Sequence, residues 1–241
     1  MQTDPRFSLV FAKKKKEFAV PAPLAPIADT HAHLMSFWDK DPAEVIARAA
    51  LAGVRQMTTI WDPLADHRDA ATYHEQLVGW IDQARDLLDQ ALAAGAVPLE
   101  PAGVLAGPCA DSNPRALLSR ISFLAGVHPY GAPEYTDDVH AQVLEALDSP
   151  LCSGVGEIGL DYHFDAEDNI EAAPHQMQMD VMARQLSLAV ERNLPVELHL
   201  RHEADDVERS SHLDAYSVLK RVGVPAAGCV LHCFGEDRAT M

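Results

Sequence analysis

Two histidines stand one residue apart in the stretch DTHAHL, at His31 and His33, directly after a short apolar run. In a β-strand, side chains at positions i and i+2 point to the same side, so both imidazoles would project together from one strand end. Two imidazoles held in this way can bind one metal ion. Two ordinary polar residues in a loop would have the same sequence, so the pair indicates a metal site only if further ligands exist.

Four more side chains that can bind metals fall late in predicted strands further along the chain. They are His128 in GVHP, Glu157 in GEIGLDY, His199 in ELHLR and His232 in LHCF. In a barrel of parallel strands, the carboxyl ends of the strands form the face where active sites lie. A single histidine is more often an ordinary core or surface residue. Five histidines and one glutamate, each late in a successive strand, favour a metal site.

The elements that must position these residues alternate between short apolar runs and amphipathic helical patterns from residue 27 onward. This alternation is typical of βα units and a parallel sheet, and it predicts an α/β fold. The clearest helix is predicted over 177–193, and a second long one over 73–95. The expected strands are PIADTHAH, VRQMTTIW, SFLAGVHP, CSGVGEIGLDY, LPVELHLR and GCVLHCF.

Residues 1–26 are expected to form a flexible N-terminal tail, because the run Lys13–Lys16 is followed by a proline-spaced stretch that disfavours a helix. The lysine run could contact an acidic partner or nucleic acid, and a solvated tail is the other reading. Residues 27–241 are expected to form one domain, with an enlarged segment over about 62–120.

Composition limits the classes of function. Hydrophobic residues make up 48% of the 241 residues, which allows a sizeable core. We see no apolar run that could span a membrane and no secretion signal, so a cytoplasmic protein without a membrane partner is expected. The formal charge of −17 makes a poor surface for long polyanions, so any nucleic-acid role needs a local site.

The four cysteines are scattered and form no C-x-x-C pair, which gives no indication of a zinc ribbon or a redox pair. Buried, reduced thiols are expected at Cys109, Cys152, Cys229 and Cys233.

Taken together and in this order, DTHAHL, GVHPY, GEIGLDY, RQLSLAVERNLPVELHLR and LHCF resemble the TatD family of metal-dependent hydrolases, within the amidohydrolase superfamily. The resemblance covers the chain from about residue 27. It implies a TIM-type (β/α)8 barrel, with about six βα units present here, and a site for two divalent metal ions. It also implies hydrolysis of phosphodiester bonds, so DNA ends or a small phosphodiester are the expected partners.

The resemblance also assigns metal ligands, residue by residue. His31 and His33 would bind one ion, Glu157 would bridge both, and His199 and His232 would bind the second. Imidazole and carboxylate ligands suit zinc, manganese, magnesium, nickel or a similar ion, and the sequence leaves the metal's identity open.

Glu157, His128 and Arg201 are the expected catalytic residues. His128 could contact a substrate phosphate or a metal ligand. Arg201 could hold a phosphate oxygen, and a structural ion pair is the alternative. Asp161 is expected to fix a ligand or a loop. His163, His175 and His202 match no ligand position.

The chain departs from the family pattern in two ways. The interval between DTHAHL and GVHP is longer than is typical of the family, which predicts an enlarged second βα unit. The chain stops after HCFGEDRATM, before the family's eighth strand and its metal-binding aspartate. It is therefore expected to be a fragment or a truncated product of uncertain activity; completion of the barrel by association is a third explanation.

Two other functions stay open. A superfamily relative could cleave an amide, an ester or a lactone with the same metal-bound water. A truncated barrel without the aspartate could bind metal without catalysis.

Overall fold

The computed structural model describes residues 4–36, 40–103, 110–163 and 171–238. Within this part of the chain, the main sheet has the strand order β3-β4-β5-β6-β7-β8, and each register that is defined is parallel. Sequential parallel strands are the arrangement of a (β/α) barrel, so the predicted α/β fold with six βα units is confirmed. The strands are β3 (Ile27–Ala32), β4 (Val54–Trp61), β5 (Ile121–Ala125), β6 (Cys152–Asp161), β7 (Val196–Arg201) and β8 (Cys229–Leu231).

Two of the helices between these strands lie where the sequence pattern predicts them. The helix predicted over 177–193 is α5 (His175–Arg192), and the one predicted over 73–95 is α3 (Ala70–Ala93). Among the described residues, no helix is both long enough and apolar enough to cross a bilayer. The other helices are α1 (Pro42–Leu51), α2 (Pro63–Asp66), α4 (Asp137–Ala146) and α6 (Ser210–Val222).

The chain divides into two compact units. The first comprises residues 1–59 and 74–122, and the second comprises residues 60–73 and 123–241. The single domain expected over 27–241 and the boundary near residue 26 stay predictions.

In the first unit, a buried arginine joins a helix end to a distant segment. The Arg55 side chain is completely buried and donates hydrogen bonds to backbone carbonyls. Burial lowers the pKa of its guanidinium. The accepting carbonyls belong to Ala50, Val54, Asp111 and Ser112. Because a buried charge must be hydrogen-bonded, these four carbonyls fix the end of α1 and residues 111–112 to the start of β4.

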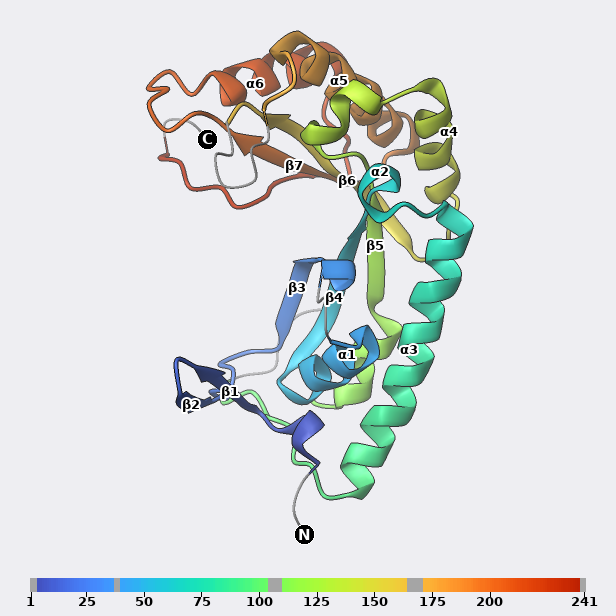
Figure 1. The fold of residues 1–241 in the computed structure, drawn as a ribbon, viewed down its shortest axis with the longest axis vertical. Coiled ribbons are helices and arrows are strands. Elements are labelled where there is room, and N and C mark those ends of the chain that lie inside the picture. The colour runs from blue at the N-terminus through green and yellow to red at the C-terminus, as the bar shows by residue number, and fades with distance from the viewer. Residues whose placement is uncertain (1–3, 37–39, 104–109, 164–170, 239–241) are drawn as a thin grey trace. The chain divides into compact units, whose positions relative to one another are not determined.

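The segment before residue 27 contains regular structure. A 3-10 helix at Pro5–Phe7 is followed by an antiparallel hairpin of β1 (Val10–Lys13) and β2 (Lys16–Ala19), drawn in dark blue in Figure 1. The Phe7 side chain is buried, and Arg48 in α1 donates a hydrogen bond to the Ser8 carbonyl over 3.0 Å. The expected flexible tail is therefore attached to α1 by its first residues.

In the second unit, α5 and α6 pack against each other and beside β6 and β7 (Figure 1). The apolar stripe of α5 is buried, as its helical spacing predicts. Two glutamines on the same face are also buried. The Gln185 side chain bonds to both the amide and the carbonyl of Val127, and Gln178 does the same with Asp161. This helix therefore holds the backbone directly before His128 and at Asp161.

Candidate metal centre and active site

The carboxyl ends of β6 and β7 carry the centre of the candidate site. The parallel register pairs Gly159 with His199 and Asp161 with Arg201, so the two strands present their polar side chains on one face. Gly159 has a φ of +145°, and a Cβ atom there would lie 2.0 Å from the His199 carbonyl oxygen. Glycine is therefore required for the two strands to approach this closely.

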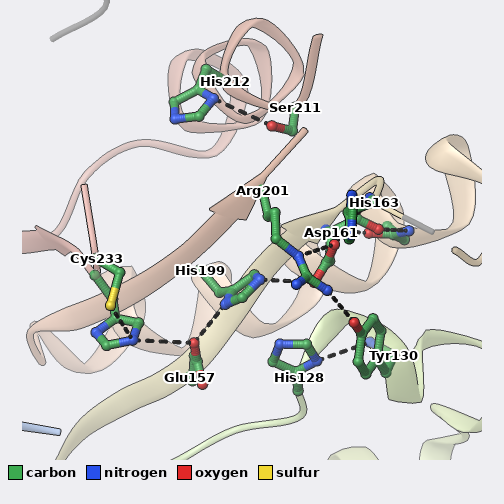
Figure 2. Close-up of polar contacts among 12 residues, drawn as sticks. His128, Tyr130, Glu157, Asp161, His163, His199, Arg201, Ser211, His212 and Cys233 are labelled. Atoms are coloured by element: carbon green, nitrogen blue, oxygen red, sulfur yellow. Dashed lines mark hydrogen bonds and ion pairs between the residues drawn. The ribbon is translucent and has the colours of Figure 1, made fainter. Parts of the chain in front are cut away.

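His199 lies between two buried carboxylates (Figure 2). Its Nδ1 atom is 2.7 Å from Glu157 Oε1, and its Nε2 atom is 3.0 Å from Asp161 Oδ2. Burial alone would lower the pKa of His199, but the hydrogen bonds to Asp161 and Glu157 outweigh it and raise the pKa to about 9. In the absence of a metal, the imidazole therefore carries a proton at neutral pH.

Arg201 forms the structural ion pair that the sequence left open. Its Nε atom lies 3.0 Å from both carboxylate oxygens of Asp161, and its Nη2 atom donates to the Tyr130 hydroxyl. The Asp161 side chain is fully buried, whereas 38% of the Arg201 side chain is exposed. Burial would raise the pKa of Asp161, but the hydrogen bonds from His199 and Arg201 lower it. Asp161 thus orients both an imidazole and a solvent-accessible guanidinium.

His232 follows directly after β8, and its backbone amide donates to the Leu198 carbonyl over 2.9 Å. Its Nε2 atom lies 4.0 Å from Glu157 Oε1 and 3.2 Å from Cys233 Sγ. The Glu157 carboxylate is therefore within reach of both His199 and His232. These three residues are brought together as the strand pattern predicts.

His128 does not end a strand, because β5 ends three residues earlier, at Ala125. Instead it caps a 3-10 helix at Pro129–Glu134, and its Nδ1 atom accepts a hydrogen bond from the Tyr130 amide. Its ring packs 4.5 Å from that of His199, centroid to centroid. Burial, followed by the neighbouring His199, lowers the pKa of His128 to about 4. His128, Asp161 and His199 form a cluster whose ligand atoms lie within 4.8 Å of one another.

His31 and His33 belong to the first unit and form a close pair there. His31 lies in β3, and His33 follows the strand end. Their Nε2 atoms are 2.8 Å apart, and the ring centroids are 4.7 Å apart. The prediction that both imidazoles project together is therefore confirmed within this unit.

A pocket of about 290 Å³ lies beside the candidate ligands in the second unit. The residues that line it include His199, Arg201, His202, His212 and His232. The Nδ1 atom of His202 is buried without a hydrogen-bond partner among the described residues. The pocket thus borders two of the candidate imidazole ligands, His199 and His232.

Sequence reasoning gave Tyr130 and Asp62 no role. Asp62 caps α2, and its Oδ2 atom accepts a hydrogen bond from the His128 amide over 2.9 Å. The Asp62-Pro63 pair is a helix-capping signal that the sequence shows. The contact of Asp62 with His128, 66 positions away, leaves no such signal. Tyr130 lies in the quoted motif GVHPY, and only the fold brings its hydroxyl to Arg201.

The expected burial of the cysteines is wrong for the described residues. Cys152 and Cys229 are half-buried and Cys233 is exposed, because Cys233 lies in the turn after β8 rather than in the core. All three are free thiols, as expected. Cys109 lies outside the described residues.

Comparison with known proteins agrees with this arrangement. The sequence profile described as TatD related DNase matches residues 115–241. The chain is 34% identical over 109 residues to an uncharacterized metal-dependent hydrolase, YabD, of Bacillus subtilis, covering 45% of this chain and 37% of that protein. It is 33% identical over 114 residues to the 3'-5' ssDNA/RNA exonuclease TatD of Pantoea vagans, covering 47% and 38%.

The crystal structure of YJJV, a TatD homolog from Escherichia coli K12, superposes with a TM-score of 0.52 at 21% identity. The match covers 89% of this chain and 62% of that one, and it shows that the two share a fold. The matched part of this chain spans less than two fifths of YabD and of the Pantoea exonuclease. Because the family profile covers more than half of the chain, this chain belongs to the TatD-related DNase family.

Proposed function

We propose that this chain provides the metal-binding part of a phosphodiesterase that acts on nucleic-acid ends. The observation that carries the proposal is the Glu157 carboxylate, buried between the imidazoles of His199 and His232. The names of the relatives support the reaction class, because one is a metal-dependent hydrolase and another is an ssDNA/RNA exonuclease.

The donor set fits divalent ions. Imidazole nitrogens and carboxylate oxygens are ligands for zinc, manganese, nickel and similar metals. Whichever nitrogen of His199 binds an ion, a carboxylate faces the other one, and this arrangement fixes the orientation of a ligating histidine. The proton that His199 carries without metal would be released on binding.

We assign His31 and His33 to one ion, Glu157 to both, and His199 and His232 to the second. The order of the motifs and the local geometry of each group support this assignment. When bound, such ions supply a water of lowered pKa and neutralise charge on the phosphate.

Arg201 and His128 are proposed to contact the substrate phosphate. The guanidinium of Arg201 is oriented by Asp161 yet accessible to solvent, which suits an oxygen of a phosphodiester. The His128 ring packs against His199, so it would also position that ligand.

The test uses the full chain, stripped with a chelator and reloaded with Mn²⁺ or Zn²⁺, on a single-stranded DNA labelled at its 5′ end. Glu157→Gln keeps the shape of the side chain and removes its charge. It should abolish both 3′-end shortening and the binding of about two ions per chain. The matched control is Glu145→Gln, the same change at an exposed position in α4. Equal metal content and equal cleavage in Glu157→Gln and wild type would refute the assignment.

A further inference from the structure

The hairpin Val10–Ala19 presents charged and aromatic side chains to solvent in one small element. Its antiparallel register pairs Phe11 with Phe18 and Lys13 with Lys16. Every residue of β2 is exposed, so neither β2 nor the aromatic pair belongs to a core. An isolated two-stranded hairpin is marginally stable on its own, and these exposed side chains add little packing to it.

The turn of the hairpin places lysines where other residues are favoured. Lys14 and Lys15 have φ angles of 47° and 66°, both in the left-handed region. A two-residue turn with positive φ at both positions favours Asn-Gly, because larger side chains are strained there. Both lysines are exposed, so the strained turn places two positive charges at the tip of the hairpin.

The aromatic pair stands beside this charge. The rings of Phe11 and Phe18 are stacked, with centroids 5.2 Å apart and planes inclined by 20°. They are 49% and 42% exposed, which is unusual for two phenylalanines in contact. Exposed rings next to cations form the platform on which the bases of a single strand can stack.

The charge of the hairpin opposes that of the chain. Residues 10–19 contain four lysines and one glutamate, whereas the whole chain has a formal charge of −17. A polyanion is repelled by most of this surface, so it needs a local cationic contact. The hairpin provides such a contact.

We propose that the hairpin Val10–Ala19 binds single-stranded nucleic acid, with Lys14, Lys15 and Lys16 on phosphates and Phe11 and Phe18 against bases. The choice of nucleic acid rests on the proposed nuclease function. A duplex is a poorer fit, because its bases are stacked inside the helix and out of reach of the rings. An anionic bilayer is also a poorer fit, because two rings offer little apolar area for insertion.

Binding is measured by the fluorescence anisotropy of a labelled oligo-dT of about a dozen nucleotides. The full chain is used in EDTA, so that neither hydrolysis nor metal contributes. Phe11→Ala with Phe18→Ala should weaken binding by roughly fivefold or more, because each stacked base is lost. Its matched control is Tyr216→Ala, an aromatic residue that is 64% exposed on α6 and should not matter.

The second variant combines Lys14→Asn with Lys15→Gly. It fits the turn better than the wild type, so the hairpin is retained while two charges are lost. The slope of log affinity against log salt should fall by about 1.4, which is the value for two phosphate contacts on a single strand. Lys220→Gln with Arg221→Gln removes the same charge from exposed positions of α6 and should leave the slope unchanged.

Unchanged affinity and slope in both hairpin variants would overturn the proposal. So would binding of the wild type to phosphatidylserine vesicles without binding to oligo-dT. Failure of the nuclease proposal would be seen separately, as absence of cleavage in Mn²⁺ by a chain that still binds oligo-dT through the hairpin.

Discussion

Replacement of Asp161 by asparagine removes one charge from the most buried carboxylate of the candidate site. The wild-type side chain accepts hydrogen bonds from His199 Nε2, from Arg201 Nε and from the His163 amide. Asparagine keeps the shape and one acceptor oxygen. It leaves the guanidinium of Arg201 without its anionic partner and removes one of the two carboxylates that hold the proton on His199.

The expected loss in the free energy of unfolding follows from the burial of this ion pair. Removal of one partner from a buried ion pair costs about 3–5 kcal/mol. Arg201 is 38% exposed, so water replaces part of the lost interaction. We therefore expect Asp161→Asn to lower the free energy of unfolding by about 2–3 kcal/mol at pH 7.

The pH dependence gives a second, independent check. The hydrogen bonds from His199 and Arg201 hold the pKa of Asp161 below its ordinary value of 3.8, against the opposing effect of burial. A carboxyl group whose folded pKa is lowered contributes its full stability above the unfolded pKa and loses it as the pH falls through the folded pKa. The difference between wild type and variant should therefore be constant from pH 7 to about 5 and shrink below about 4.

The assay is urea unfolding followed by circular dichroism, in EDTA so that metal binding adds nothing. Asp180→Asn is the matched control, because Asp180 lies exposed on α5 and accepts only one resolved hydrogen bond, from Gln176. A loss in Asp161→Asn no larger than in the control, or one that does not depend on pH, would refute the role given to this carboxylate.

Three further predictions concern other residues. Gly159→Ala should destabilise the protein by roughly 2–4 kcal/mol in the same urea assay, because the new Cβ would overlap the His199 carbonyl at a strained φ; an unchanged midpoint would contradict the close strand approach. Burial lowers the pKa of His140, so the unfolded state binds a proton more readily and stability falls as the pH drops below about 6.5. The loss between pH 7 and 5 should be smaller in His140→Gln, and equal losses would count against burial as the cause. Burial raises the pKa of Cys152 to about 11, so iodoacetamide at pH 8 should label exposed Cys233 well before Cys152, as read by peptide mass spectrometry; the reverse order would show that this thiol is accessible.

The strands and long helices could be predicted because their patterns are local. The alternation of apolar runs and amphipathic stretches fixed β6, β7 and α5 to within a few residues. His199 and Arg201 could be placed on one face of β7 from their spacing alone, since side chains two apart in a strand share a face.

The features that could not be predicted from the sequence depend on contacts between distant segments. No local pattern distinguishes Arg201 as a phosphate ligand from Arg201 as the partner of Asp161, 40 residues away. The GVHP motif looked like a strand end, but Pro129 begins a 3-10 helix there, and His128 caps it. The hairpin was missed because Lys-Lys is not a turn sequence that favours positive φ.

The hydrogen bonds from Arg55 to four backbone carbonyls limit how the chain can vary in length between α3 and β5. Arg55 ties residues 111–112 to the end of α1, so the return of the chain towards β5 is anchored there. The stretch after α3 is also held by backbone hydrogen bonds, from the Leu99 amide to the Leu51 carbonyl and from the Ala102 amide to the Pro23 carbonyl, so a change in its length costs more than loop-closure entropy alone. The end of α1 is thus a common anchor for the chain on its way from α3 back to the sheet.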